Sequence, residues 1–211
     1  MKIINVFCKQ LLYAAVFLAN TTLAASETAE LDKFYNNVST FTAIFKQKIS
    51  DSKGNTLQES YGSFLLKRPG NFRWEYQSPA HVIMVSDGKN IWSYDVSLQQ
   101  AIVRPVSTLL DSVPIMLLTK SQSLERYFHI SKKIRKDSLA WIELKPKLEN
   151  SEFRKLYVGF FGGLLKKLEF QDNFDQLTSI SFQLDKVNNS IDDDVFKLTL
   201  PRNVDILGKP E

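Results

Sequence analysis

The sequence predicts a mainly β protein, in which about eleven short antiparallel strands form a sheet large enough to curl into a barrel or half-barrel. Short runs of alternating apolar and polar residues, separated by turn-forming residues, follow one another along most of the 211 residues. The chain has 15 Phe, 7 Tyr and 3 Trp but only 8 Gly, a composition that favours strands with large apolar side chains. With 44% hydrophobic and 24% charged residues, it is neither disordered nor a polytopic membrane protein.

The N-terminus is predicted to be a secretory signal peptide covering residues 1–24. Two lysines flank the start of the apolar run Leu11–Ala19, and small residues follow, with cleavage expected after Ala24 or Ala25. The apolar run is shorter than the roughly 20 residues that a membrane-spanning helix needs. We therefore expect an exported, soluble chain in which residues 25–211 form a single domain.

This segment also contains the only cysteine, Cys8. After cleavage the chain can form neither a disulfide nor a thiolate metal site. Cleavage lowers the number of basic residues from 27 to 25 against 23 acidic residues, a formal charge of +2. A charge so small and dispersed does not indicate nucleic-acid binding.

An amphipathic helix is predicted where the mature chain begins. Leu31, Phe34, Tyr35 and Val38 recur at i, i+3, i+4 and i+7, and Ser26 can serve as the N-cap.

Strands are predicted from Phe41 onward, where the apolar period changes to two. Phe41–Ser50 alternates, Asp51–Asn55 supplies a hairpin turn, and Leu57–Leu66 forms the second strand. Further alternating runs predict strands at Asn71–Tyr76, His81–Ser86, Ile91–Asp95, Gln100–Arg104, Phe128–Ile134, Leu139–Leu144, Lys155–Phe161, Leu165–Phe170, Leu177–Asp185 and Phe196–Leu200.

One segment, Thr108–Leu118, interrupts the strand pattern. Ser112 can cap a helix there and Pro114 can occupy its first turn. The segment has more large aliphatic residues than a short surface helix needs. We expect one or two short helices that, with the N-terminal helix, cover the open mouth or concave face of the sheet.

An arginine lies beside the most aromatic strand. Phe72, Trp74 and Tyr76 share one face of their strand, and Arg68 has the same parity. If Pro69–Gly70 keeps the register, the guanidinium faces the apolar side and must be hydrogen-bonded. A bulge at the same place would return Arg68 to solvent, and parity alone does not decide between the two.

The sequence shows no motif for catalysis. His81 and His129 lie far apart without zinc-protease spacing, and there is no nucleophile elbow or phosphate-binding glycine loop. Asp192–Asp194 lacks the spaced ligands of a calcium site. We expect no enzyme, metal or cofactor; the alternative is a secreted hydrolase that uses Ser, His and Asp residues from several strands.

Five segments resemble one known family, in the same order along the chain. They are Phe41–Lys48 (FTAIFKQK), Lys67–Trp74 (KRPGNFRW), Val85–Asp95 (VSDGKNIWSYD), Leu98–Ala101 (LQQA) and Val113–Leu118 (VPIMLL). Together these segments are similar to those of the LolA family of periplasmic outer-membrane lipoprotein carriers.

The resemblance implies an incomplete antiparallel β-barrel closed by an α-helical lid, with an apolar cavity that takes the acyl chains of a lipoprotein. It implies a monomeric periplasmic carrier without enzymatic activity or cofactor. Such a carrier receives lipoproteins from an ABC transporter in the inner membrane and delivers them to an acceptor at the outer membrane. The alternative is a periplasmic lipid-binding or lipoprotein-sensing module of the same fold that performs no handoff.

The resemblance also implies roles for individual residues. Arg68 matches an arginine that hydrogen-bonds to the lid in the closed, empty state, so Arg68 is the expected lid lock. The acyl-chain cavity and lid are expected to include Leu31, Tyr35, Phe41, Phe45, Phe72, Trp74, Met84, Trp92, Ile115, Met116, Leu117 and Leu118.

Overall fold

The structure is a computed structural model that describes residues 28–106, 124–149 and 151–211. The predicted signal peptide and the short helices expected at Thr108–Leu118 lie outside these residues. Within the described part of the chain, no helix combines the length and the apolar character needed to cross a bilayer.

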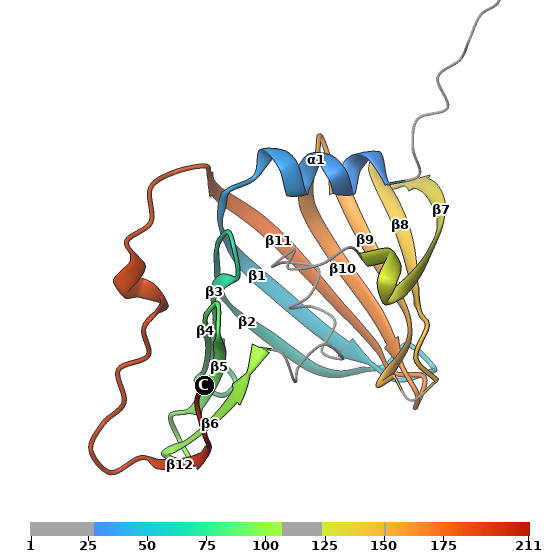
Figure 1. The fold of residues 1–211 in the computed structure, drawn as a ribbon. Helices are drawn as coiled ribbons and strands as arrows, with labels where there is room; N and C mark the ends of the chain where they lie inside the picture. The colour runs from blue at the N-terminus through green and yellow to red at the C-terminus, as the bar shows by residue number, and fades with distance from the viewer. Residues whose placement is uncertain (1–27, 107–123, 150) are drawn as a thin grey trace, which may run out of the picture.

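Twelve strands form one curled sheet that does not close into a barrel (Figure 1). They are β1 (Thr40–Ser50), β2 (Thr56–Lys67), β3 (Asn71–Ser78), β4 (Val82–Asp87), β5 (Asn90–Asp95), β6 (Gln100–Pro105), β7 (Phe128–Lys136), β8 (Leu139–Pro146), β9 (Phe153–Phe161), β10 (Leu164–Asp172), β11 (Leu177–Val187) and β12 (Asp205–Gly208). The order is β12-β6-β5-β4-β3-β2-β1-β11-β10-β9-β8-β7. The mainly β, half-open architecture is confirmed. Strands β1 to β11 pair antiparallel, and β12 adds a parallel edge to β6.

The first hairpin follows the predicted alternation. In β1 every second side chain from Phe41 to Gln47 is buried. At the turn, Asp51 Oδ1 accepts hydrogen bonds from the backbone N–H groups of Lys53 (2.9 Å) and Asn55 (2.8 Å). The side-chain amide of Asn55 also donates to this carboxylate, and these hydrogen bonds lower the pKa of Asp51. The turn therefore fixes the register of β1 and β2 through local bonds.

At Gly62 the register between β2 and β3 shifts, and the backbone of β3 lies close to the position that a side chain would take. A Cβ atom at this position would lie 1.8 Å from the carbonyl oxygen of Glu75 and 2.9 Å from the Phe45 ring. Only glycine allows this approach, which bends the sheet around its concave face.

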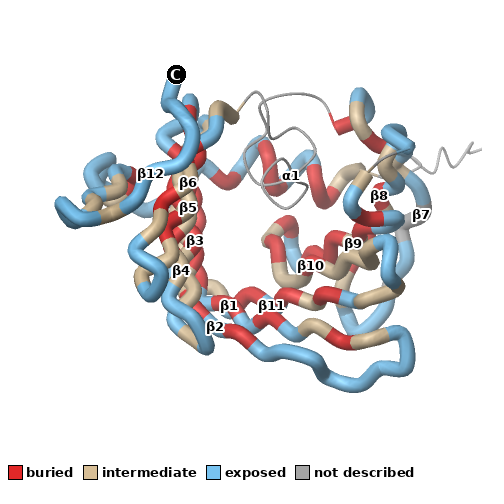
Figure 2. Tube along the Cα trace, turned by 90° about the horizontal axis from the view of Figure 1, so that it is seen from below, coloured by how far each residue is buried: buried red, intermediate tan, exposed pale blue. Residues whose placement is uncertain are grey.

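The helix α1 (Ala29–Asn37) lies across one end of the concave face (Figures 1 and 2). Leu31, Phe34 and Tyr35 are buried, which confirms the predicted helical spacing. The residue that precedes α1 is Thr28, so the prediction of Ser26 as the N-cap was wrong. The helix lies against β9 and β10, and the short 3-10 helix η2 (Leu124–Arg126) precedes β7.

The C-terminal segment covers the convex face, which corrects the predicted strand at Phe196–Leu200. Residues Asp193–Phe196 form the 3-10 helix η3, and Phe196 packs on Ile83 and Val85 of β4. Strands β3, β4 and β5 are already paired on both sides. An apolar segment that crosses them can therefore bury its side chains on their face but cannot join them as a strand. Figure 1 shows this segment running outside the sheet before it ends at β12.

Replacing Gly62 by alanine tests the close approach of β2 and β3. We expect Gly62→Ala to lower the free energy of unfolding by about 3 kcal/mol, because the methyl group meets backbone atoms that cannot move aside. The control is Gly54→Ala in the first turn, where φ is +86° and the added atom meets open space. Gly54→Ala should lower the free energy of unfolding by only about 1 kcal/mol, because it adds backbone strain and no steric clash. Urea unfolding followed by circular dichroism measures both values, and equal losses would contradict the account.

Candidate functional site: the apolar concave face

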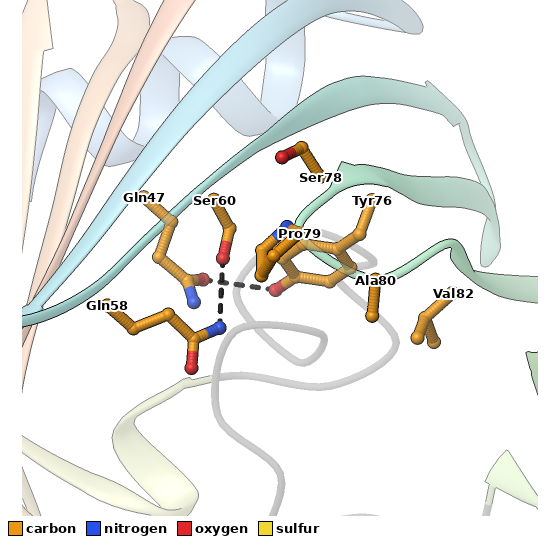
Figure 3. Close-up of a pocket in the computed structure, with 8 residues that line it drawn as sticks. All are labelled: Gln47, Gln58, Ser60, Tyr76, Ser78, Pro79, Ala80 and Val82. Carbon is orange, nitrogen blue, oxygen red and sulfur yellow. Dashed lines mark hydrogen bonds between the residues drawn. The ribbon is translucent and has the colours of Figure 1, made fainter. Parts of the chain in front are cut away.

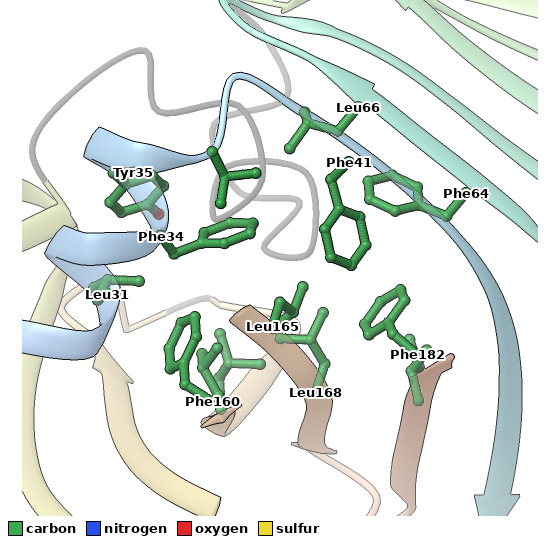
Figure 4. Packing of buried hydrophobic residues seen from close by; sticks show 14 of the residues in the cluster. Leu31, Phe34, Tyr35, Phe41, Phe64, Leu66, Phe160, Leu165, Leu168 and Phe182 are labelled. Carbon is green, nitrogen blue, oxygen red and sulfur yellow. The ribbon is translucent and has the colours of Figure 1, made fainter. Parts of the chain in front are cut away.

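The concave face carries the largest apolar cluster in the described residues, built from the sheet and α1 together (Figure 4). Its fully buried side chains include Phe34, Phe41, Phe64, Leu66, Phe72, Phe160, Ile142, Leu144, Leu156, Leu165 and Leu168. Strands from both halves of the sheet contribute, so the cluster spans the curl rather than one hairpin.

Aromatic rings form a continuous path from the helix to the middle of the sheet. Ring centroids are 6.1 Å apart for Phe34 and Phe41, 6.0 Å for Phe41 and Phe64, and 4.9 Å for Phe64 and Trp74. Trp74 is 4.8 Å from Phe45. Tilted and edge-on pairs of this kind contribute about 0.5 to 1.5 kcal/mol each beyond burial. The concave face is therefore a broad aromatic surface with α1 as part of its cover.

Arg68 faces this apolar side, which decides between the two orientations left open by the sequence. Its Nε donates a hydrogen bond of 2.8 Å to the carbonyl oxygen of Val38, directly after α1. The guanidinium lies over the rings of Phe34 and Tyr35, at 5.0 and 4.9 Å from their centroids. A cation is favourable at a helix C-terminus and against aromatic faces. Arg68 thus joins the β2–β3 loop to the helix.

Burial shifts the pKa values of both Arg68 and Tyr35. It lowers the pKa of Arg68 and raises the pKa of Tyr35, although each group moderates the shift of the other. At neutral pH the guanidinium stays charged and the phenol stays neutral. The contact therefore does not depend on pH in the physiological range.

Glu30 joins the other end of α1 to the sheet. Its Oε2 accepts a hydrogen bond of 2.8 Å from the backbone N–H of Gly163, and its Oε1 pairs with Lys33 Nζ at 3.1 Å. Gly162 and Gly163 both have positive φ and lie in the turn between β9 and β10. A buried carboxylate needs such donors to remain charged.

Asn188 holds the C-terminal end of α1 beside Arg68. Its side-chain amide donates to the carbonyl of Asn37 at 2.7 Å and accepts from the backbone N–H of Ser39 at 2.8 Å. The helix is thus tied to the sheet by polar bonds at both ends, and between them Leu31 and Phe34 pack in the apolar cluster.

Sequence reasoning did not select Glu30 or Asn188. Glu30 stands four residues before Phe34 and so shares its face, a signal that the helical period already contained. For Asn188 there was no comparable signal, because its role depends on a contact between residues 151 positions apart.

The structure brings together most of the predicted site. Leu31, Tyr35, Phe41, Phe45, Phe72 and Trp74 belong to the concave cluster, and Met84 packs against it. The placement of Trp92 in the cavity was wrong, because it pairs with Val85 across β4 and β5 and packs with Phe196 on the convex face. The predicted lid residues Ile115, Met116, Leu117 and Leu118 lie outside the described residues.

The histidines do not join the concave cluster. His81 Nε2 lies 2.9 Å from Glu75 Oε1 at an exposed position, and Arg73 bonds to the same carboxylate. Burial alone would raise the pKa of Glu75, but these hydrogen bonds lower it. His129 is exposed on β7. Among the residues that the structure describes, no group of three or more His, Cys, Asp or Glu side chains could hold a metal ion.

Comparisons with known proteins point to one family. The profile described as Outer membrane lipoprotein carrier protein LolA matches residues 36–199. An outer-membrane lipoprotein carrier protein of Methylobacillus flagellatus is 38% identical over 188 residues, which is 89% of this chain and 92% of the relative. Another of the same name, from Methylococcus capsulatus, is 36% identical over 178 residues, 84% of this chain and 86% of the relative.

A solved structure shares the fold. An uncharacterized conserved protein from Thermus thermophilus superposes with a TM-score of 0.58 and 13% sequence identity, over 86% of this chain and 98% of that chain. At this identity the likeness concerns the arrangement of strands alone.

Removing the Glu30 carboxylate tests how α1 is held. We expect Glu30→Ala to speed hydrogen exchange of the α1 amides about tenfold, because a buried, charge-assisted hydrogen bond contributes about 1.5 to 3 kcal/mol. The central strands β1 and β2 should be unaffected. Asp32→Ala is the control, since Asp32 is exposed on the same helix and bonds only locally to Thr28. Equal exchange of α1 in Glu30→Ala and the unmodified protein would show that this bond does not hold the helix.

Proposed function

Because this chain belongs to the LolA family of outer-membrane lipoprotein carrier proteins, we propose that it carries lipoproteins by holding their acyl chains on the apolar concave face. The observation that carries the proposal is the aromatic concave surface, one end of which is covered by a helix that polar bonds hold at both its ends. The family membership rests on the match over residues 36–199 and on the relatives named above.

The free energies favour such a carrier. Each methylene group transferred from water to an apolar surface contributes about 0.8 kcal/mol, so an acyl chain of ordinary length would lose about 10 kcal/mol if it crossed water unprotected. A carrier must supply an apolar surface for that chain and must cover the same surface when no chain is bound. Helix α1 provides part of that cover, through Leu31, Phe34 and Tyr35.

Loading then exchanges one set of apolar contacts for another. In the closed state Arg68 and Glu30 hold α1 over the concave cluster. When acyl chains enter, they replace contacts of the helix with the sheet, and the polar bonds at its ends break. The free energy needed to break them lowers the net affinity for the cargo. The lower affinity allows an acceptor to take the lipoprotein without a further energy source.

We also propose the partners and location that this role requires. Residues 1–24 direct export to the periplasm, where an ABC transporter of the inner membrane supplies the lipoprotein. An acceptor at the outer membrane receives it, and the carrier acts as a monomer. Binding and release of this kind need no catalytic residue, metal or cofactor.

The rival function, a lipid-binding or lipoprotein-sensing module without handoff, is not favoured, because the relatives at 36% and 38% identity are named as carriers. A direct test separates the two. The purified protein is incubated with inner-membrane vesicles that contain the releasing transporter, a triacylated lipoprotein and ATP. A carrier should leave the vesicles in a soluble complex with the lipoprotein and pass it to outer-membrane vesicles. A protein that retains only free phospholipid in this assay would contradict the proposal.

Replacing Arg68 tests its proposed role as the lid lock. Arg68→Leu removes a charged hydrogen bond worth about 1.5 to 3 kcal/mol, which should favour the open state about tenfold or more. Because opening then costs less, the variant should hold its lipoprotein more tightly and release it more slowly to acceptor membranes. Arg68→Lys keeps the charge, and its release rate should lie between those of Arg68→Leu and the unmodified protein. Release from Arg68→Leu at the unmodified rate would remove Arg68 from the mechanism.

A further inference from the structure

The concave face changes from apolar to polar at the end away from α1. Along β1, Phe45 is followed on the same face by Gln47, and Ser60 of β2 lies directly opposite Gln47. Along β3, Trp74 is followed on the same face by Tyr76, which carries a hydroxyl group. The aromatic surface therefore ends in a group of buried or half-buried polar side chains.

A small cavity opens at this polar end (Figure 3). It has a volume of about 190 Å³. Its lining residues are Gln47, Gln58, Ser60, Tyr76, Ser78, Pro79, Ala80 and Val82. A cavity of about 150 Å³ can hold a benzene molecule, so a cavity of this size has room for an ester group and the carbons next to it, but not for a whole lipid.

The polar side chains at the cavity are hydrogen-bonded to one another, and within the described residues the Gln47 amide is left with free N–H donors. Burial raises the pKa of Tyr76 to about 12, so its hydroxyl keeps its proton and donates to Gln47 Oε1 at 3.0 Å. This bond occupies the amide oxygen of Gln47 and leaves its Nε2 protons without an acceptor among the described residues. Gln58 Nε2 in turn donates to Ser60 Oγ at 3.0 Å.

A second donor lies beside them in the aromatic surface. Trp74 is 3% exposed, and its buried indole N–H makes no hydrogen bond of good geometry among the described residues, although it interacts with the Tyr76 hydroxyl and lowers the pKa of that group. A buried donor without an acceptor is unfavourable, and native proteins rarely keep one without a reason. Of these two donors only Gln47 lines the cavity, and its amide N–H, with the buried Trp74 N–H in the adjoining aromatic surface, points to a ligand that supplies oxygen acceptors.

We propose that Gln47, with Tyr76 and Trp74 beside it, forms a subsite that hydrogen-bonds the ester carbonyl of an acyl chain lying on the concave face. The inference rests on the proposed function, because that function places an acyl chain on the apolar surface and the subsite binds the polar end of the same acyl chain. An acyl ester has an apolar chain attached to a polar carbonyl group. On the concave face, the aromatic surface is followed in the same way by the polar group at Gln47. The ester oxygens are acceptors only, which matches the donors.

Paired ester and ether probes test the subsite. Binding is measured by calorimetry with a synthetic diacylglyceryl-cysteine peptide and with its ether-linked analogue, which has chains of the same length but no carbonyl oxygens. The unmodified protein should bind the ester about threefold to tenfold more tightly, as one net hydrogen bond provides. A diacyl phospholipid and its ether analogue form a second pair, which separates the two sources of an acyl ester. The same preference should appear in that pair, since the subsite contacts the ester and not the peptide.

Two variants test whether the preference for ester over ether probes comes from the subsite. Gln47→Met keeps the length of the side chain without its amide, and should bind ester and ether almost equally while its ether affinity stays unchanged. Tyr61→Phe is the matched control, because Tyr61 is exposed on the opposite face of β2 and loses only a hydroxyl group. It should keep the full ester preference.

The outcomes separate the subsite from the carrier role. Equal binding of ester and ether by the unmodified protein would overturn the subsite and leave the carrier function intact, and this comparison needs no variant. An ester preference in the peptide pair that is absent from the phospholipid pair would also overturn it. Failure of the protein to bind any of the probes would contradict the proposed function itself.

Discussion

The central constraint on this protein is that the concave face of its open sheet is apolar and cannot be left in contact with water. A closed barrel would bury such a face within itself, but here β7 and β12 are unpaired edges of the described sheet, which stays open. Helix α1 therefore has to cover one end of the face, and the C-terminal segment covers part of the convex side in a separate cluster. Because α1 is not part of the sheet that it covers, a bound acyl chain can displace it without breaking strand pairs.

Helix α1 is held on the sheet by two kinds of contact, of which acyl chains can replace only the apolar kind. The apolar contacts of α1 with Phe41 and Phe160 are not specific to a helix, because hydrocarbon chains can replace them with similar free energy. The polar bonds of Arg68 and Glu30 are specific to the closed state, and no acyl chain can reproduce them. The apolar contacts thus set what the face binds, while the polar bonds set how readily it opens.

The sequence predicted features that depend on local periodicity, and it failed where distant contacts decide. The period of 3.6 placed Leu31 and Phe34 on the buried side of α1, and the period of two placed Phe72 and Trp74 on one face of β3. Periodicity could not show which face of the sheet is concave, and Trp92 was therefore assigned to the wrong side. An alternating pattern also predicted a strand at Phe196, where no free edge existed for one to join.

A reversible covalent lock on α1 tests most directly whether the helix must move for the cargo to bind. A Cβ atom at Gly163 would lie 3.1 Å from Lys33 Cβ, somewhat closer than the roughly 3.5 to 4.5 Å of a disulfide, so a shift of a few tenths of an ångström lets Lys33→Cys with Gly163→Cys join α1 to the β9–β10 turn. Lipoprotein loading is measured before and after reduction of the same sample. The account predicts that the oxidised protein does not load and that reduction restores loading. Equal loading of the oxidised and reduced forms would contradict it.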